Sequence, residues 1–245
     1  MLRAEQGQKV GCAMIQERNR EAARWLQEPL DWEEEAETGP NPGTAAPFED
    51  APVIYYMGRR IYFRSPEPED EPLLRRWVND PRVWSTLKFR GPRNAIHQRE
   101  WIESLGKTRT DHTFGIVVRE TDRLIGTAGL HGIDPFNRSA TFGLCIGDAA
   151  FRGKGYGTEA TRLAMRYGFQ ELNLNRIELS VFGHNWRAIR VYQKCGFVHE
   201  GCLRQAVYRH GQYQDEYKFA ILREEWNRLA GADGPDSTWI GGWAE

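Results

Sequence analysis

The chain has 245 residues, of which 40% are hydrophobic and 12% aromatic, enough for one large globular domain with an extension. Its formal net charge is −1 and its basic residues form no dense run, which argues against a nucleic-acid-binding protein. No apolar run is long enough to cross a membrane and the first residues lack the apolar core of a secretion signal, so we expect a cytoplasmic protein without a membrane partner.

The first 57 residues differ in composition from the rest. They contain 11 acidic and 5 basic side chains, and residues 31–52 combine the run Glu33–Glu35 with several prolines. Like charges and prolines argue against packed structure, which predicts an acidic extension and linker over residues 1–57. Residues 58–245 contain 23 acidic and 28 basic side chains, a mild preference for anions.

A folded domain is predicted over residues 58–230, followed by a tail over residues 231–245. Alternation over residues 60–64 predicts a strand. A second helix is predicted to begin near Asn94. Before it, four apolar residues are spaced to share one face of a helix that Pro81 ends: Leu73, Leu74, Trp77 and Val78.

The rest of the domain alternates strands and helices. The turn at Glu120–Arg123 predicts a hairpin between two strands. The predicted strands are 113–119, 123–132, 139–146, 176–181, 197–201 and 216–222, and the predicted helices are 158–173 and 186–195. This order predicts an α/β (α+β) fold with a single mixed, mostly antiparallel central sheet flanked by helices.

A glycine-rich segment, Arg152–Thr158, lies between a predicted strand and a predicted helix. Glycine lets the backbone turn sharply, and a helix start offers unpaired N–H groups and the positive end of a dipole. Arg152 and Lys154 add positive charge, and Thr158 can cap the helix or bind an oxygen. The segment therefore predicts a phosphate cradle, with a glycine turn that binds nothing as the alternative.

Two common nucleotide loops do not fit this segment. A Walker loop requires a Lys-Ser/Thr pair after its last glycine, which is absent here. The dinucleotide fingerprint requires G-x-G-x-x-G in a first strand-helix unit, whereas the spacing here is G-x-G-x-G and lies late in the chain. The phosphate-bearing ligand is therefore of another kind.

Two motifs resemble the signatures of the GNAT N-acetyltransferase superfamily. Residues 152–157, Arg-Gly-Lys-Gly-Tyr-Gly, resemble its Q/R-x-x-G-x-G/A motif, and residues 185–197 match N-x-x-A-x-x-x-Y-x-K-x-G-F at every named position. The resemblance runs from about Gly58 to Trp226. It is nearest to the branch that holds the ribosomal-protein N-terminal acetyltransferases and the spermidine acetyltransferases.

The resemblance implies acetyl-CoA as co-substrate. The pyrophosphate would lie on the glycine segment, and the pantetheine arm along residues 144–146, where that strand splays from the strand 176–181. A backbone N–H near Leu144 or Cys145 would polarise the thioester carbonyl. The residues implied to hold acetyl-CoA are Leu144, Cys145, Ile146, Arg152, Gly153, Lys154, Gly155, Tyr156, Gly157, Thr158 and Asn185.

Tyr192 is the expected catalytic residue, as the proton donor to the departing thiolate. A phenol pKa near 10 lies about 1.5 units above that of a typical thiol, so the transfer is mildly uphill but feasible. Tyr192 could instead be an ordinary apolar helix position, and Asn185 a helix cap. No base is singled out from five carboxylates: Asp134, Glu178, Glu200, Asp215 and Glu216.

No metal site is expected. Cys12, Cys145, Cys195 and Cys202 contain no C-x-x-C pair and, with six histidines, show no metal-ligand spacing. The thiols are expected to be free, as in a reducing compartment.

The acceptor is expected to lie against residues 82–94, where Trp84 and Phe89 could line a pocket. Because this segment is basic, and because Thr141 stands where spermidine acetyltransferases tend to carry glutamate, a peptide N-terminus or a small amino compound is favoured. The alternatives are a polyamine or aminoglycoside acetyltransferase and a non-catalytic CoA-binding or protein-interaction module. A homo-oligomer is possible.

Overall fold

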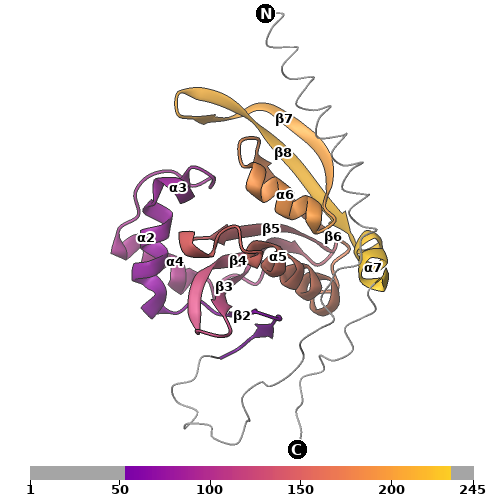
Figure 1. The fold of residues 1–245 in the computed structure, drawn as a ribbon, viewed down its shortest axis with the longest axis horizontal. Helices are drawn as coiled ribbons and strands as arrows, with labels where there is room; N and C mark the ends of the chain where they lie inside the picture. The colour runs from indigo at the N-terminus through magenta and orange to yellow at the C-terminus, as the bar shows by residue number, and fades with distance from the viewer. Residues whose placement is uncertain (1–52, 233–245) are drawn as a thin grey trace, which may run out of the picture.

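The structure, a computed structural model, describes residues 53–232 and is built around one eight-stranded sheet with the order β1-β2-β3-β4-β5-β6-β8-β7 (Figure 1). The strands are β1 (Tyr56–Met57), β2 (Ile61–Arg64), β3 (His112–Val118), β4 (Arg123–Asp134), β5 (Ser139–Ile146), β6 (Arg176–Phe182), β7 (Val198–Arg209) and β8 (Gln212–Leu222). The helices are η1 (Pro68–Asp70), α2 (Glu71–Asn79), α3 (Pro81–Trp84), α4 (Ala95–Ser104), η2 (Ala149–Phe151), α5 (Tyr156–Arg166), η3 (Tyr167–Glu171), α6 (Trp186–Lys194) and α7 (Arg223–Ala232).

The predicted mixed, mostly antiparallel sheet is confirmed. Among the described strands, β5 and β6 form the parallel pair and the other neighbours are antiparallel. The sheet begins with β1, just before the expected boundary at Gly58, because Met57 pairs with Tyr62. The predicted extension, apart from its last residues, and nearly all of the tail lie outside the described residues, as does Cys12.

Helices cover both faces of the sheet. Alternate residues of β2 divide between two apolar clusters: Ile61 and Phe63 pack with α5 and α6, whereas Tyr62 packs with α2, α3 and α4. Figure 1 shows α2, α3 and α4 together at one end of the sheet. The second face is therefore covered over β2–β4 by these three helices.

Pro81 does not simply end a helix. The helix α2 ends at Asn79 as predicted, but Pro81 opens the short helix α3. Proline is tolerated at a first helical position because that N–H has no helical partner. The Asp80 side chain caps α3 by accepting a hydrogen bond of 2.8 Å from the Arg82 N–H.

The helix predicted over residues 158–173 differs at both ends. It begins at Tyr156, because Gly155 takes a left-handed conformation (φ 84°) immediately before it. At its other end, α5 widens into the π-helical turn η3, in which the Leu172 N–H donates to the Tyr167 carbonyl over 3.2 Å. Helix α7, which was not predicted, is held by stacking of Trp226 on Phe169 at 5.3 Å.

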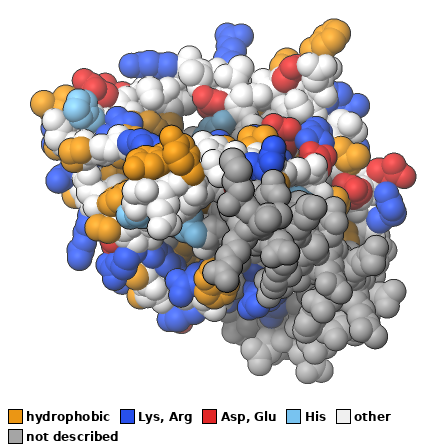
Figure 2. Space-filling model, turned by 90° about the horizontal axis from the view of Figure 1, so that it is seen from above, with side chains coloured by type: hydrophobic (Ala, Val, Ile, Leu, Met, Phe, Trp, Pro, Cys, Tyr) orange, Lys and Arg blue, Asp and Glu red, His pale blue; other side chains and the backbone are white. Residues whose placement is uncertain are grey.

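The surface seen in Figure 2 mixes basic, acidic and apolar side chains over the part of the chain that the structure describes. No stripe of one charge marks a binding site on that face. The candidate site is therefore located from backbone geometry.

Candidate functional site

The strands β5 and β6 pair only at one end. Their parallel register is limited to Ser139↔Arg176, Ala140↔Ile177 and Thr141↔Glu178. Beyond these pairs β5 continues to Ile146 and β6 to Phe182. The expected separation of the two strands is thus present, and it leaves facing backbone edges that an extended ligand could pair with.

The glycine segment forms a turn that ends in a helix N-terminus. Gly153 has φ 75° and Gly155 φ 84°, both in the left-handed region that favours glycine. The helical hydrogen bond from the Glu159 N–H to the Gly155 carbonyl is 3.0 Å long. The three preceding N–H groups, of residues 156–158, lie in the first turn of α5, where helical geometry supplies no acceptor. This arrangement suits a phosphate oxygen.

An ion pair that the sequence did not reveal holds this turn in place. The Glu159 carboxylate accepts hydrogen bonds from the Arg60 N–H (2.6 Å) and the Arg60 Nε (2.9 Å). The same guanidinium donates to the Lys154 carbonyl at 3.2 Å and lies 4.6 Å above the Tyr156 ring. The two partners are 99 positions apart, so no local sequence signal connects them.

The Arg152 side chain is turned away from the cradle. Its Nε donates to the Ile146 carbonyl at 2.8 Å and its guanidinium to the Gly147 carbonyl at 3.0 Å. It therefore ties the glycine turn to the end of β5. Of the two basic side chains expected to face the ligand, Lys154 is the exposed one.

Tyr192 is buried on α6, with 6% of its surface exposed. Its ring lies 6.2 Å from that of Phe142 and 5.9 Å from that of Phe197. Burial raises the pKa of the Tyr192 phenol above its usual value, and the nearby Cys195 and Cys145 thiols add to the rise. The phenol is therefore protonated at neutral pH, as a proton donor must be.

The thiols and Asn185 have structural roles. Burial raises the pKa of Cys145 to about 11 and that of Cys195 to about 12, so neither is a thiolate at neutral pH. The Asn185 side chain accepts a 3.3 Å hydrogen bond from the Ala188 N–H and caps α6. The expected contact of Asn185 with the pantetheine arm stays a prediction.

The segment expected to receive the acceptor is clamped to the β7–β8 hairpin. Arg209 donates to the carbonyls of Leu87 and Phe89, the latter at 2.9 Å. Its guanidinium also lies 5.7 Å from the Trp84 ring. The Lys88 Nζ is 2.6 Å from the Glu216 carboxylate. We call these contacts the hairpin clamp.

The clamp places the two expected acceptor residues differently. The Arg209 guanidinium lies between Trp84 and Phe182, 5.9 Å from the latter ring, so Trp84 stands near the end of β6. The Phe89 ring is instead covered by the Arg93 guanidinium at 4.2 Å. Trp84 is thus the better placed of the two to meet a ligand at the strand separation.

The five carboxylates considered as bases already have partners. Hydrogen bonding to Arg176 holds the pKa of Glu200 below its usual value. Burial opposes ionisation of Glu216, but hydrogen bonds from Lys88 and Ser180 outweigh it and lower its pKa. The other three bind Arg176, the Asn137 N–H and the Gln205 N–H: Glu178, Asp134 and Asp215. Hydrogen bonds from Asn137 also lower the pKa of Asp134, and stabilised anions such as Glu200, Glu216 and Asp134 are poor bases.

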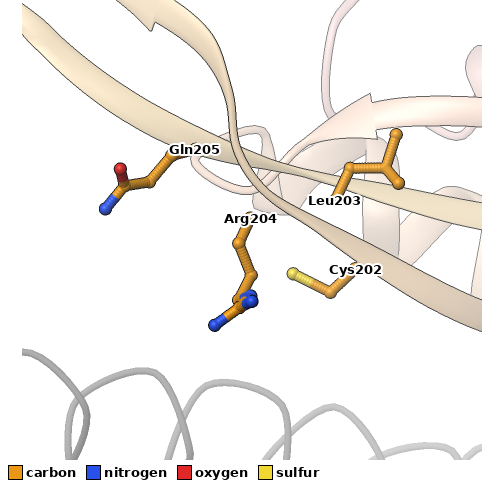
Figure 3. Close-up of a pocket in the computed structure, with 4 residues that line it drawn as sticks. All are labelled: Cys202, Leu203, Arg204 and Gln205. Carbon is orange, nitrogen blue, oxygen red and sulfur yellow. The ribbon is translucent and has the colours of Figure 1, made fainter.

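A shallow pocket lies on β7, outside the strand separation. Figure 3 shows its lining residues side by side along one strand: Cys202, Leu203, Arg204 and Gln205. Leu203 pairs with Glu216 of β8, which pairs with Phe182 at the end of β6, so β8 lies between this pocket and the strand separation. Gln205 has φ 53°, at an irregularity in the β7–β8 register.

The sequence that forms the strand separation and the glycine turn matches a known family. A family model described as "Acetyltransferase (GNAT) domain" matches residues 60–198. The chain belongs to the GNAT acetyltransferase family. The resemblance inferred from the two motifs is therefore confirmed, and with it the activity, acetyl-CoA-dependent N-acetylation of an amine.

Individual GNAT relatives agree with the branch that the motifs indicated. The N-acetyltransferase p20 of Bacillus licheniformis is 33% identical over 68% of this chain and 95% of its own length. YdaF of Bacillus subtilis, whose name assigns it to the ribosomal N-acetyltransferases, is 36% identical over 69% of this chain and 95% of its own. The solved spermidine N-acetyltransferase of Vibrio cholerae with CoA and spermine has a TM-score of 0.64 and 27% identity, covering 68% of this chain and 98% of that chain.

Two further properties concern the described residues alone. No group of three or more His, Cys, Asp or Glu side chains within residues 53–232 is arranged to hold a metal ion. In the same range, no helix has the length and apolarity needed to cross a bilayer.

Proposed function

We propose that this GNAT enzyme acetylates a peptide N-terminus or a small amino compound, with acetyl-CoA bound along the separated edge of β5. The observation that carries the proposal is the joint occurrence of two features. The strands stop pairing after Thr141 and Glu178, and the glycine turn with its helix N-terminus lies at the far end of the same strand.

The residues present fit acetyl-CoA. The N–H groups of residues 156–158 and the Lys154 side chain suit its pyrophosphate. The edge of Leu144–Ile146 that faces β6, and that β6 does not pair with, suits the amides of its arm. Acetyl-CoA supplies the activated acetyl group as a thioester. The Leu144 or Cys145 N–H would polarise its carbonyl as an oxyanion hole does.

Tyr192 would protonate the departing thiolate. Burial keeps its phenol protonated, and the packing of its ring against Phe142 of β5 supports this role. Proton transfer from the phenol to the departing thiolate becomes more favourable when the thiolate beside it is desolvated.

The acceptor would enter beside Trp84 on the face that α2–α4 leave uncovered. A polyamine acceptor is the second candidate, because a similar solved structure is a spermidine N-acetyltransferase with spermine. Against it, Thr141 offers no charge on β5, and Arg209 adds positive charge near Trp84, whereas the charge of Lys88 is paired with Glu216. A neutral or singly charged acceptor fits these surroundings better.

The test is a panel of amines with acetyl-CoA and the purified chain. Short peptides with free N-termini, amino acids and spermidine are compared by thiol release and by the mass of the acetylated product. Faster acetylation of a peptide or amino compound than of spermidine is expected. Faster turnover of spermidine would favour the polyamine reading, whereas CoA binding without any product would indicate a non-catalytic module.

A further inference from the structure

His131 lies on β4 beside the strand separation, on the face opposite to α5 and α6. It pairs with Thr141, the last residue of β5 that pairs with β6. On β5, Ala140 and Phe142 pack with the α5 cluster, so the alternate residues Thr141 and Gly143 face the other way. No local motif in the sequence marks His131.

Two glycines make room for the His131 ring. A Cβ added to Gly129 would stand 2.7 Å from the His131 Nε2, and one added to Gly143 would stand 3.4 Å from it. Gly129 and Gly143 are themselves a cross-strand pair. The Nε2 atom therefore lies over this pair, further along the sheet toward the separated end of β5.

This position is next to the proposed reacting carbonyl. Leu144, whose N–H is a candidate to bind that carbonyl, follows Gly143 by one residue, about 3.3 Å along a strand. The His131 side chain is 43% exposed, so an acceptor amine or a water molecule can reach it. Tyr192 belongs to the cluster on the opposite face. The two groups thus stand on opposite faces of the same strand.

The surroundings of His131 suit a base. The Asp111 Oδ1 is fixed by the Gly132 N–H at 2.8 Å and lies 3.8 Å from the His131 Nδ1. This charge favours the proton on Nδ1 and leaves the Nε2 lone pair free to accept another. Burial lowers the pKa of His131, although Asp111 opposes the change, so the imidazole is neutral at pH 7.

The other ionisable groups on this face do not compete. Glu178, across β5 from His131, is bound by Arg176 at 3.1 Å. The Cys145 thiol, two residues beyond Gly143, has its pKa raised to about 11 by burial and stays protonated. His131 is the group here that can gain a proton near neutral pH.

Resting on the proposed function, we propose that His131 is the general base of acetyl transfer. Its Nε2 accepts one proton from the acceptor ammonium, directly or through one water, so that the amine lone pair can attack the thioester carbonyl. The new C–N bond replaces the C–S bond, and the thiolate takes its proton from Tyr192. The attacking nitrogen loses its second proton to solvent as it becomes an amide, and the Tyr192 phenolate takes a proton back from solvent. The exposed imidazolium, stabilised by Asp111, then returns its proton to solvent.

The test measures kcat/KM against pH for the wild type, His131→Gln and His97→Gln, with acetyl-CoA and the fastest amine of the panel. The wild type should show an acidic limb at or below the usual histidine pKa of about 6.5. His131→Gln should lose that limb and fall about 100-fold at pH 7, with unchanged CoA affinity by calorimetry. His97, exposed on α4, provides the matched control and should leave both quantities unchanged.

Asp111→Asn gives a second, independent readout. Asparagine keeps an acceptor for the Gly132 N–H but removes the charge that raises the pKa of His131, so the acidic limb should move to lower pH. A wild-type rate and pH profile in His131→Gln, or an unmoved limb in Asp111→Asn, would overturn the base assignment while acetyl transfer itself stands. If no amine in the panel is acetylated, the proposed function fails and the assignment fails with it.

Discussion

The burial of the Tyr192 side chain has two effects. The ring stabilises the core between Phe142 and Phe197, and the same burial raises the pKa of the phenol. A proton donor with a raised pKa remains protonated over the whole range in which the protein is assayed. The packing of the helix and the proposed proton transfer therefore depend on the same residue.

Tyr192→Phe is expected to lower kcat about 100-fold while leaving CoA affinity nearly unchanged, because only the hydroxyl is removed. Since the pKa of Tyr192 is raised above 10, the loss should be the same at pH 7 and pH 9. Rates and calorimetry check this. Tyr208→Phe, at an exposed tyrosine of β7, is the control, and an unchanged kcat in Tyr192→Phe would remove its role.

At the scale of elements, the glycine turn depends on a strand far from it in sequence. Arg60, just before β2, supplies the backbone and side-chain donors that hold Glu159 in the first turn of α5. The turn therefore keeps its shape before any ligand binds. Such preorganisation lowers the ordering cost of binding.

Glu159→Gln should weaken CoA binding about tenfold, because about 1.5 kcal/mol of charge-assisted hydrogen bonding to Arg60 is lost. Calorimetry with CoA measures the change. Glu224→Gln, at an exposed ion pair on α7, is the matched control and should bind CoA as the wild type does. Undiminished affinity in Glu159→Gln would show that the turn holds its shape without Arg60.

Elements with strong local patterns were predicted well from the sequence. The bounds of β5 agree with the prediction, and α6 begins at Trp186 as expected. The strand predicted to end at Gly201 continues to Arg209, because the irregular, largely exposed stretch around Gln205 breaks the alternation that marks a strand. Helix α7 was not predicted, because the contact that holds it joins Trp226 to the ring of Phe169, which is distant in sequence.

The candidate site was predicted only where its residues are local. The glycine turn and Tyr192 belong to short motifs, so their pattern was visible. The Arg60–Glu159 pair, the hairpin clamp and the His131–Asp111 pair join segments that only the fold brings together. Partners that are distant in sequence leave no periodic signal.

For the whole molecule, the separated strands make CoA a stabilising ligand. CoA at 100 times its dissociation constant should raise the free energy of unfolding by about 2.7 kcal/mol. It should also slow amide exchange in residues 142–146, where β5 lacks pairing with β6. Mass spectrometry after hydrogen exchange measures the second effect.

Adenosine 3′,5′-bisphosphate separates the contribution of the phosphates from that of the pantetheine arm. It carries phosphates without the pantetheine arm, so it should stabilise the fold less and leave exchange in residues 142–146 unchanged. Equal exchange in this stretch with and without CoA would contradict placement of the arm along β5.

The hairpin clamp has a consequence for the order in which the protein matures during translation. Leu87 is made early, whereas Arg209, which holds its carbonyl, follows 122 residues later. The glycine turn and its anchor, Arg60 and Glu159, are complete before the ribosome reaches either strand of the clamp. A nascent chain thus acquires the residues for the acetyl donor first, and the wall that faces the acceptor is fastened only after β7 and β8 have been made.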